Sequence, residues 1–395
     1  MITKQRLLNF ILNKTTVIIT YISIALLIAI LKYSLGEPNS HINNYIIFKS
    51  SFKHFSEGLN LYSFYPKEYF DLFLYGPLFS LFIAPFAIMP VILGVSAWNV
   101  LNGVLFLYAI YELPDLSNST KGIIAWITLN SCITSFSNVQ FHGITAALII
   151  LSYTNIKKGK ESLAAFHIVL GSLLKLYGIV GLAFFFFSKN KPKLIFWGFA
   201  WSILLLLLPL SIGSFNYLMQ SYKDWFEILR HENTVNVAIE NMCTDFSVMG
   251  MVRRLSSDPT ISSMFFIIPV IIVFGFSFLR YKYFDKTNFQ LLILSSVLLL
   301  PVLASTGTEA STLLIGFVGV TIWYVISKKQ PIDHFLFFFA LIFSSFGPTD
   351  LMPKFFRDEY LRKYALMALP MFMVWLKINY EILFDYKNKE VETIL

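Results

Sequence analysis

The sequence predicts an all-α, polytopic membrane protein with about twelve transmembrane helices, and three observations support this fold class. Hydrophobic residues make up 56% of the 395 residues, and the mean hydropathy is +0.66. Charged residues make up only 14%, against about 25% in soluble proteins. Because a soluble surface cannot be built from so few charges, most side chains must face lipid or a buried bundle. The same composition excludes a nucleic-acid-binding protein, a disulfide scaffold and a disordered chain.

The first predicted span covers residues 15–31 and is preceded by the basic residues Lys4, Arg6 and Lys14. These charges indicate a cytoplasmic start. A cleaved signal peptide would have a shorter apolar core, followed by small residues at a cleavage site. Lys32 follows the apolar run instead, so we expect this span to be retained.

Further apolar runs follow along the whole chain, at 91–112, 122–137, 140–156, 162–174, 176–187, 194–211, 261–279, 289–304, 310–327, 332–347 and 364–384. Several are shorter than the ~20 residues that cross a bilayer core. Lys175 and Gly178 interrupt the region 162–187, which predicts either two short broken helices or one long helix. Irregular backbone at membrane depth is tolerated only where it is buried or lines a cavity. No internal repeat or flexible linker divides the chain, so we expect a single membrane domain, residues 1–395.

Basic residues in the loops predict which side of the membrane each loop occupies. The basic clusters are Lys157/Lys158/Lys160, Lys189/Lys191/Lys193, Arg280/Lys282/Lys286, Lys328/Lys329 and Lys387/Lys389. If 162–187 crosses the membrane out and back, all of these clusters fall on one face, which the positive-inside rule assigns to the cytoplasm. Both termini are then cytoplasmic, and the two long loops, 36–90 and 212–260, lie on the extracytoplasmic face.

The segment 75–90, YGPLFSLFIAPFAIMP, is apolar enough to span, but counting it would place every basic cluster outside. We therefore expect it to lie in the outer interface or to form a shallow re-entrant helix. Pro77, Pro85 and Pro90 favour this placement, because each proline removes a backbone donor.

Motifs for metal or nucleotide chemistry are missing from the sequence. Cys132 and Cys243 are expected to be free thiols, since no CxxC or Cys/His cluster accompanies them. There is no DxD, Walker A, GxSxG or HExxH motif. We therefore expect neither a metal nor a cofactor.

Polar residues at unusual positions mark candidate binding groups. The first long loop interleaves aromatic residues with amides and ionisable groups, which is typical of interfacial anchors but also suits carbohydrate. The turn SNVQFHG presents Gln140 and His142, either as a polar turn or as ligands. Lys175 lies in an apolar stretch, where a lysine is a functional candidate or snorkels to the interface. Ser247 and Arg253 follow Asp245 near the end of the second long loop, and an arginine there suits phosphate or lipid headgroups.

Together these segments resemble the membrane glycosyltransferases of family 87, bacterial enzymes of the GT-C superfamily related to polyprenyl-phosphate-mannose-dependent mannosyltransferases. The likeness rests on NNYIIFKSSFKHFSEGLNLY, which contains Asn43, Asn44 and Tyr62, on LYGPLFSLFIAPFAIMP and on Trp98. SNVQFHG is similar to the family's G-Q-x-N turn, and GSLLKLYG is similar to its lysine-containing segment. DFSVMGMVRRL resembles its N-Q-S-x-x-G-x-x-R stretch. The similarity covers about residues 40–255.

The resemblance implies a GT-C membrane bundle with juxtamembrane helices in the first outer loop. It also implies transfer of a sugar from a polyprenyl-phosphate donor to a lipid or glycan acceptor, at the outer face of the bacterial inner membrane. The donor carries a single phosphodiester charge, so Lys175 and Arg253 are expected to bind it. Tyr62, Gln140, His142 and Ser247 are then further substrate-binding residues.

The sequence departs from the family at the main catalytic position, where the expected aspartate is Asn43 or Asn44. An amide cannot act as a general base, so we predict Asp71 as the base and Asp245 as the second choice. Asp71 lies among apolar neighbours in sequence, where a carboxylate holds a proton more tightly and so suits proton abstraction. Asn43 and Asn44 then become sugar- or acceptor-binding amides. The alternatives are a transporter or flippase for a lipid-linked glycan, and a non-catalytic partner in glycan assembly.

Overall fold

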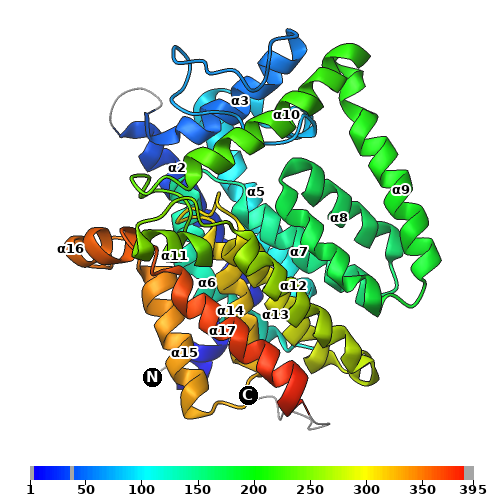
Figure 1. The fold of residues 1–395 in the computed structure, drawn as a ribbon, viewed down its shortest axis with the longest axis vertical. Coiled ribbons are helices and arrows are strands. Elements are labelled where there is room, and N and C mark those ends of the chain that lie inside the picture. Colours follow the sequence, from blue (N-terminus) through cyan, green and yellow to red (C-terminus); the bar gives the residue numbers. More distant parts are fainter. Residues whose placement is uncertain (1–3, 36–39, 387–395) are drawn as a thin grey trace. The chain divides into compact units, whose positions relative to one another are not determined.

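Helices form at every apolar run that the sequence predicts as a span. The computed structural model describes residues 4–35 and 40–386, and it contains no β-strand within them. The arrangement of the helices is drawn in Figure 1. Contacts between residues group the chain into two compact units, which are described separately. Lys387 and Lys389, the last predicted basic cluster, lie outside the described residues.

One of the two compact units, called here the aromatic unit, comprises Ile18–Glu112 and Ser135–Glu232. Its helices are α2 (Lys14–Ser34), η1 (Ser40–Ile42), α3 (Asn43–Ser56), α4 (Leu78–Ala87), α5 (Val91–Glu112), α7 (His142–Lys157), α8 (Glu161–Leu174), η2 (Leu176–Phe187), α9 (Lys191–Leu207), η3 (Leu208–Ser211) and α10 (Phe215–Asn236). The helices α7, α8 and α9 lie side by side within it (Figure 1).

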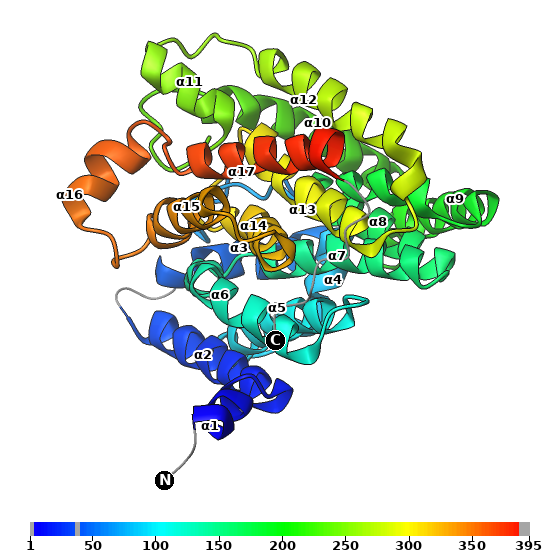
Figure 2. The ribbon, with the colours of Figure 1, turned by 90° about the horizontal axis from the view of Figure 1, so that it is seen from below.

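The other compact unit, called here the C-terminal unit, comprises the described residues of Met1–Val17, Leu113–Thr134 and Asn233–Leu395. Its helices are α1 (Lys4–Ile11), α6 (Asn118–Ser137), α11 (Val248–Ser256), α12 (Met264–Ser277), η4 (Phe278–Tyr283), α13 (Thr287–Ala304), α14 (Leu313–Ile326), α15 (Pro331–Ala340), η5 (Leu341–Phe346), α16 (Lys354–Phe356), η6 (Arg357–Arg362), α17 (Ala368–Tyr380) and η7 (Glu381–Asp385). The helices α13, α14, α15 and α17 pack together (Figure 2). Most residues of α13 are buried.

Five helices in the described parts of the chain are long and apolar enough to cross a membrane. They are Lys14–Ser34, Val91–Glu112, Lys191–Ser211, Met264–Tyr283 and Thr287–Ala304. Other apolar helices, such as Leu313–Ile326 and Pro331–Phe346, are shorter. The predicted count of about twelve spans is therefore not confirmed, although the all-helical membrane class is.

The helix α4 is too short to cross a bilayer. It has 10 residues, which at 1.5 Å per residue reach roughly 15 Å, against a hydrocarbon core of about 30 Å. Pro85 lies inside it. This agrees with the expectation that 75–90 does not span, while its placement in the outer interface stays a prediction.

The interruption at Lys175 divides the region into two short helices. α8 ends at Leu174, Lys175 is extended (φ −149°, ψ 122°), and η2 continues as a 3₁₀-helix. A 3₁₀-helix repeats every three residues, so its buried residues, Gly178, Gly181 and Phe184, share one face. Because Gly178 has no side chain, its backbone packs directly against Gly171 of α8. The polar break is thus held in place by close backbone packing.

Candidate active site

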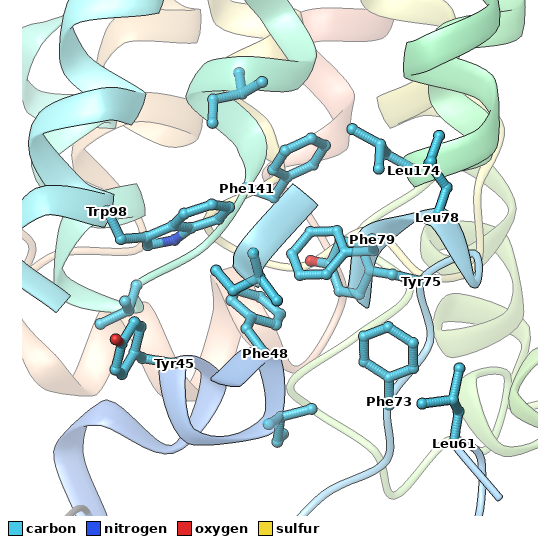
Figure 3. Close-up of a cluster of buried hydrophobic side chains, with 14 of the residues drawn as sticks. Tyr45, Phe48, Leu61, Phe73, Tyr75, Leu78, Phe79, Trp98, Phe141 and Leu174 are labelled. Atoms are coloured by element: carbon cyan, nitrogen blue, oxygen red, sulfur yellow. The ribbon is translucent and has the colours of Figure 1, made fainter. Parts of the chain in front are cut away.

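A cluster of aromatic side chains lies at the centre of the aromatic unit, and Tyr75 is one of its members (Figure 3). The Tyr75 ring centroid lies 4.5 Å from that of Phe79 and 5.1 Å from that of Phe48. Phe141 meets Tyr75 edge-on at 5.9 Å. Such edge and tilted contacts are favourable beyond simple area burial, so this cluster gives Tyr75 a fixed position.

Backbone contacts attach the segment 74–76 to neighbouring helices. The Gly76 N–H donates to the Leu174 carbonyl (3.3 Å), and Trp225 Nε1 of α10 donates to the Leu74 carbonyl (3.0 Å). A Cβ on Gly76 would lie 2.0 Å from the Leu173 carbonyl oxygen. Glycine is therefore required where this segment crosses the end of α8.

Lys175 lies against the aromatic cluster. Its Nζ is 5.3 Å from the Tyr75 ring centroid and 5.1 Å from that of Tyr177. Ammonium–ring contacts at such distances are attractive, by about 0.5–2 kcal/mol each depending on desolvation. His142, which is fully buried at the start of α7, lies within electrostatic range of the Lys175 charge. The lysine that we predict to bind phosphate is thus held beside Tyr75 and Tyr177 and near His142.

The predicted turn residues meet the same cluster. The Tyr75 hydroxyl donates to Gln140 Oε1 (3.2 Å), and Asn44 Nδ2 donates to the Asn138 carbonyl (2.8 Å). The Tyr62 hydroxyl donates to the Tyr75 carbonyl (3.0 Å). Tyr62, Gln140 and Lys175, which come from three separate sequence segments, therefore all contact Tyr75.

Asn43 connects α3 to the segment that carries Asp71. Its Oδ1 accepts the backbone N–H of Phe70 at 2.9 Å. Asp71 itself is exposed, and its Oδ1 accepts the Leu72 N–H at 2.7 Å. The expectation that apolar neighbours enclose this carboxylate is wrong: Phe70 is exposed and only Phe73 is buried.

Glu232 is a carboxylate of this region that the sequence did not single out. It lies near the end of α10 and is half-buried. Burial, together with the negative charge of Asp71, raises the pKa of Glu232. Asp71 therefore has a second carboxylate within electrostatic range. No sequence pattern connects the two, because their proximity depends on the packing of α10.

An open pocket of about 250 Å³ lies between the first long loop and α10. Asn60 and Tyr62 contribute from the loop, and Asp224, Glu227 and His231 contribute from α10. Asp224 accepts amide hydrogen bonds from Asn60 (3.0 Å) and Gln220 (2.7 Å). Most of the residues that line the pocket thus have polar side chains, and two of them are carboxylates.

The other predicted residues form a buried motif in the C-terminal unit. Ser247 is the N-cap of α11, where its Oγ accepts the Gly250 N–H (3.0 Å) and donates to Asp245 Oδ1 (2.6 Å). Arg253 lies further along α11, and its guanidinium forms an ion pair with Asp245 Oδ2 at 2.7 Å. Both side chains are buried. Burial raises the pKa of Asp245, although hydrogen bonds from Ser247 and Arg253 oppose this shift.

The Arg253 guanidinium also holds the segment before α12. Its Nε donates to the Ile261 carbonyl (2.9 Å), and a terminal nitrogen donates to Ser263 Oγ (2.6 Å). A cavity of about 420 Å³ adjoins it, with polar atoms from Ser305 and Thr306 and apolar ones from Ile267. Arg253 therefore has a structural role in addition to any contact with phosphate.

The predicted residues thus form two sets. Asp71, Asn43, Asn44, Tyr62, Gln140, His142 and Lys175 belong to the aromatic unit, and Asp245, Ser247 and Arg253 belong to the C-terminal unit. In the first set, Tyr62, Gln140 and Lys175 meet at Tyr75. In the second set, Asp245 contacts both Ser247 and Arg253.

Comparison with known proteins identifies the family. No curated protein matches the chain. The model of glycosyltransferase family 87 matches residues 73–306, which is more than half of the chain and includes Tyr75, the turn with Gln140, Lys175, Glu232 and Arg253. The resemblance seen in the sequence is confirmed: the chain belongs to glycosyltransferase family 87 and is a membrane-embedded glycosyltransferase.

Proposed function

We propose that the protein transfers a sugar from a polyprenyl-phosphate donor to a lipid or glycan acceptor, at the extracytoplasmic face of the bacterial cytoplasmic membrane. The observation that carries this proposal is the hydrogen bond from the Phe70 N–H to Asn43 Oδ1. It brings Asp71 next to the loop position where the family pattern leads us to expect an acidic residue. Asp71 thereby supplies a carboxylate that Asn43 cannot.

In the proposed reaction the acceptor hydroxyl oxygen attacks the anomeric carbon of the donor sugar. The bond between that carbon and the phosphate oxygen breaks, and polyprenyl phosphate leaves with the bonding electrons. Asp71 takes the proton of the attacking hydroxyl. A single displacement of this kind inverts the configuration at the anomeric carbon.

Glu232 is a second carboxylate near the proposed base. Burial and the negative charge of Asp71 raise the pKa of Glu232, whereas Asp71 is exposed to water. Asp71 therefore remains the proposed base.

Lys175 is the proposed phosphate ligand. The donor phosphodiester and the departing polyprenyl phosphate are anionic, and a nearby ammonium stabilises the charge that develops as the bond breaks. Tyr75 and Tyr177 hold the lysine side chain in place. Arg253 is a second candidate for the phosphate, although its existing contacts lead us to expect a loss of stability on substitution as well.

The pocket of Asn60, Tyr62, Asp224, Glu227 and His231 is the proposed acceptor site. Sugar hydroxyls exchange hydrogen bonds with amide and carboxylate groups, and an aromatic ring packs against the C–H face of a sugar. Asp224 and Glu227 would repel a phosphate. The pocket thus suits an uncharged sugar of the acceptor rather than the donor's phosphate.

The test is a set of isosteric variants assayed for both donor binding and turnover. Asp71→Asn is expected to abolish turnover while donor affinity stays unchanged, because only the base is lost. Lys175→Ala is expected to weaken donor binding by roughly 10- to 150-fold, the equivalent of one charged hydrogen bond. Lys223→Ala, an exposed lysine on α10, is the matched control. Full turnover in both Asp71→Asn and Asp245→Asn would refute the assignment of the base.

A non-catalytic role in glycan assembly is the second candidate, and the amides at the family's acidic position favour it. The variants Asn43→Asp and Asn44→Asp distinguish a catalytic transferase from a non-catalytic sugar-binding protein. If the wild type turns over no substrate but either aspartate variant does, the protein binds its lipid-linked sugar without catalysing transfer. Turnover by the wild type excludes this second candidate.

A further inference from the structure

Packing does little to fix the position of Asp71, the proposed base. Asp71 is exposed, and Phe70, the residue before it, is 69% exposed. Neither residue belongs to a helix, because α3 ends at Ser56 and α4 begins at Leu78. Where the Asp71 carboxylate lies therefore depends on the hydrogen bonds that attach the preceding residues to α3.

Two hydrogen bonds attach this segment to α3. Asn43 Oδ1 accepts the Phe70 N–H at 2.9 Å. His54 Nε2 donates to Glu68 Oε2 at 3.1 Å. Asn43 is the first residue of α3 and His54 lies in its last turn, roughly 16 Å further along the helix axis. The chain is thus held at both ends of α3, by residues that lie one and three positions before Asp71.

The residues before Asp71 form a turn that packs on the His54 ring. The N–H groups of Glu68 and Tyr69 donate to the Tyr65 carbonyl at 2.9 and 3.1 Å. The Tyr65 ring centroid lies 4.0 Å from that of His54, and the ring centroid of Tyr69, which is buried, lies 6.2 Å from it. The hydrogen bond to Glu68 and the contacts of the two tyrosine rings therefore fix this turn against the end of α3.

The hydrogen bond to Glu68, rather than packing, explains a histidine at position 54. The His54 side chain is fully buried, and its Nδ1 has no hydrogen-bond partner among the described residues. A carboxylate oxygen accepts hydrogen bonds, so in the neutral ring Nε2 carries the proton and Nδ1 keeps a buried lone pair. An apolar side chain would fill the same space without the cost of burying this nitrogen. We propose that His54, through its hydrogen bond to Glu68, is a positioning residue for Asp71; this rests on the proposed function, in which Asp71 is the base.

The position of Asp71 matters because proton transfer is sensitive to distance. A general base must lie about 2.6–3.2 Å from the oxygen whose proton it takes. A displacement of about 1 Å lowers the rate by roughly 100-fold. Loss of the bond between His54 and Glu68 is therefore expected to lower kcat by about 10- to 100-fold. Lys175, the proposed phosphate ligand, lies in another segment, so the affinity for the donor should stay unchanged.

The first measurement compares kcat and donor affinity in variants of the purified full chain. Glu68→Leu removes the acceptor at a position that is 35% exposed, where the substitution should not prevent folding. His54→Leu removes the donor, and His54→Gln keeps an N–H at the place of Nε2 and should recover most of the turnover that His54→Leu loses. Glu57→Leu is the matched control, because Glu57 is an exposed glutamate just past the end of α3, and it should turn over as the wild type does.

The second measurement follows the segment itself and needs no turnover. A nitroxide spin label on Phe70→Cys, with the exposed Cys243 replaced by serine, reports the mobility of the segment by electron paramagnetic resonance. The label should become more mobile when either His54 or Glu68 is replaced by leucine. It should keep its wild-type mobility in His54→Gln.

Wild-type kcat or unchanged label mobility in Glu68→Leu would overturn the proposal, as would a donor affinity that falls as much as kcat does. Glu68→Leu alone decides the question if His54→Leu does not fold. If the wild type turns over no donor but the label becomes mobile as expected, the proposed function fails while the placement of the segment by His54 stands.

Discussion

The close approach of η2 to α8 predicts a large effect for Gly178→Ala. A Cβ on Gly178 would lie 2.2 Å from the Gly171 carbonyl carbon and 2.5 Å from its Cα. Both are backbone atoms, so no side chain can move aside to relieve the clash. Ordinary van der Waals contact begins at 3.4 Å, and the two helices must therefore separate by roughly 1 Å.

This separation is expected to lower the free energy of unfolding by about 1–3 kcal/mol, the usual range for overpacking. The gain from replacing a helical glycine, about 0.5–1 kcal/mol, is too small to offset it. Lys175 lies in the break between the two helices, so donor binding should fall as well. Thermal unfolding of the purified protein in detergent, followed by tryptophan fluorescence, measures the first effect.

Gly198→Ala is the control for this substitution. It introduces the same methyl group into the neighbouring helix α9, where a Cβ meets open space. We expect its unfolding temperature to be equal to or slightly above that of the wild type. If Gly178→Ala unfolds at the same temperature as Gly198→Ala, the close packing that we describe at the break is incorrect.

Two further predictions concern the buried charges. Asp245→Asn is expected to destabilise the protein by about 3–5 kcal/mol, because it leaves the buried Arg253 without its ionic partner. Unfolding in denaturant measures this loss of stability, and an unchanged unfolding midpoint would contradict the prediction. Burial lowers the pKa of His54 despite its contact with Glu68. The unfolded chain therefore binds the extra proton first, and stability is lost as the pH falls below about 6.5. His54→Gln, compared by its unfolding temperature between pH 8 and 5, should lose less stability on acidification; equal losses would refute the role of His54.

Much of the fold could be predicted from hydropathy, because lipid and a buried bundle both require apolar helices. The break at Lys175 could be predicted in the same way, since a charge and a glycine interrupt the apolar pattern. The number of spans could not be predicted, because several apolar helices are shorter than the thickness of a bilayer. Apolarity alone does not distinguish a short spanning helix from one packed within the protein.

The candidate site was predicted less completely, and Asp71 shows why. The sequence places it between Phe70 and Leu72, but in an irregular segment neighbouring residues point in different directions, and Asp71 is exposed. The proximity of Glu232 depends on how α10 packs against the first loop, which no local pattern encodes. Ser247 could be recognised as an N-cap from the sequence, but the pairing of Asp245 with Arg253 also depends on the turn before α11, where Asp245 has a positive φ of 52°.

Product analysis by mass spectrometry tests the proposed sugar transfer most directly. The purified protein is incubated with polyprenyl-phosphate mannose, glucose or arabinose and a lipid extract that contains acceptors, and Asp71→Asn is treated in parallel. We expect a new acceptor species, heavier by one sugar, together with free polyprenyl phosphate, in the wild type and not in Asp71→Asn. The same product in equal yield from Asp71→Asn would refute Asp71 as the base.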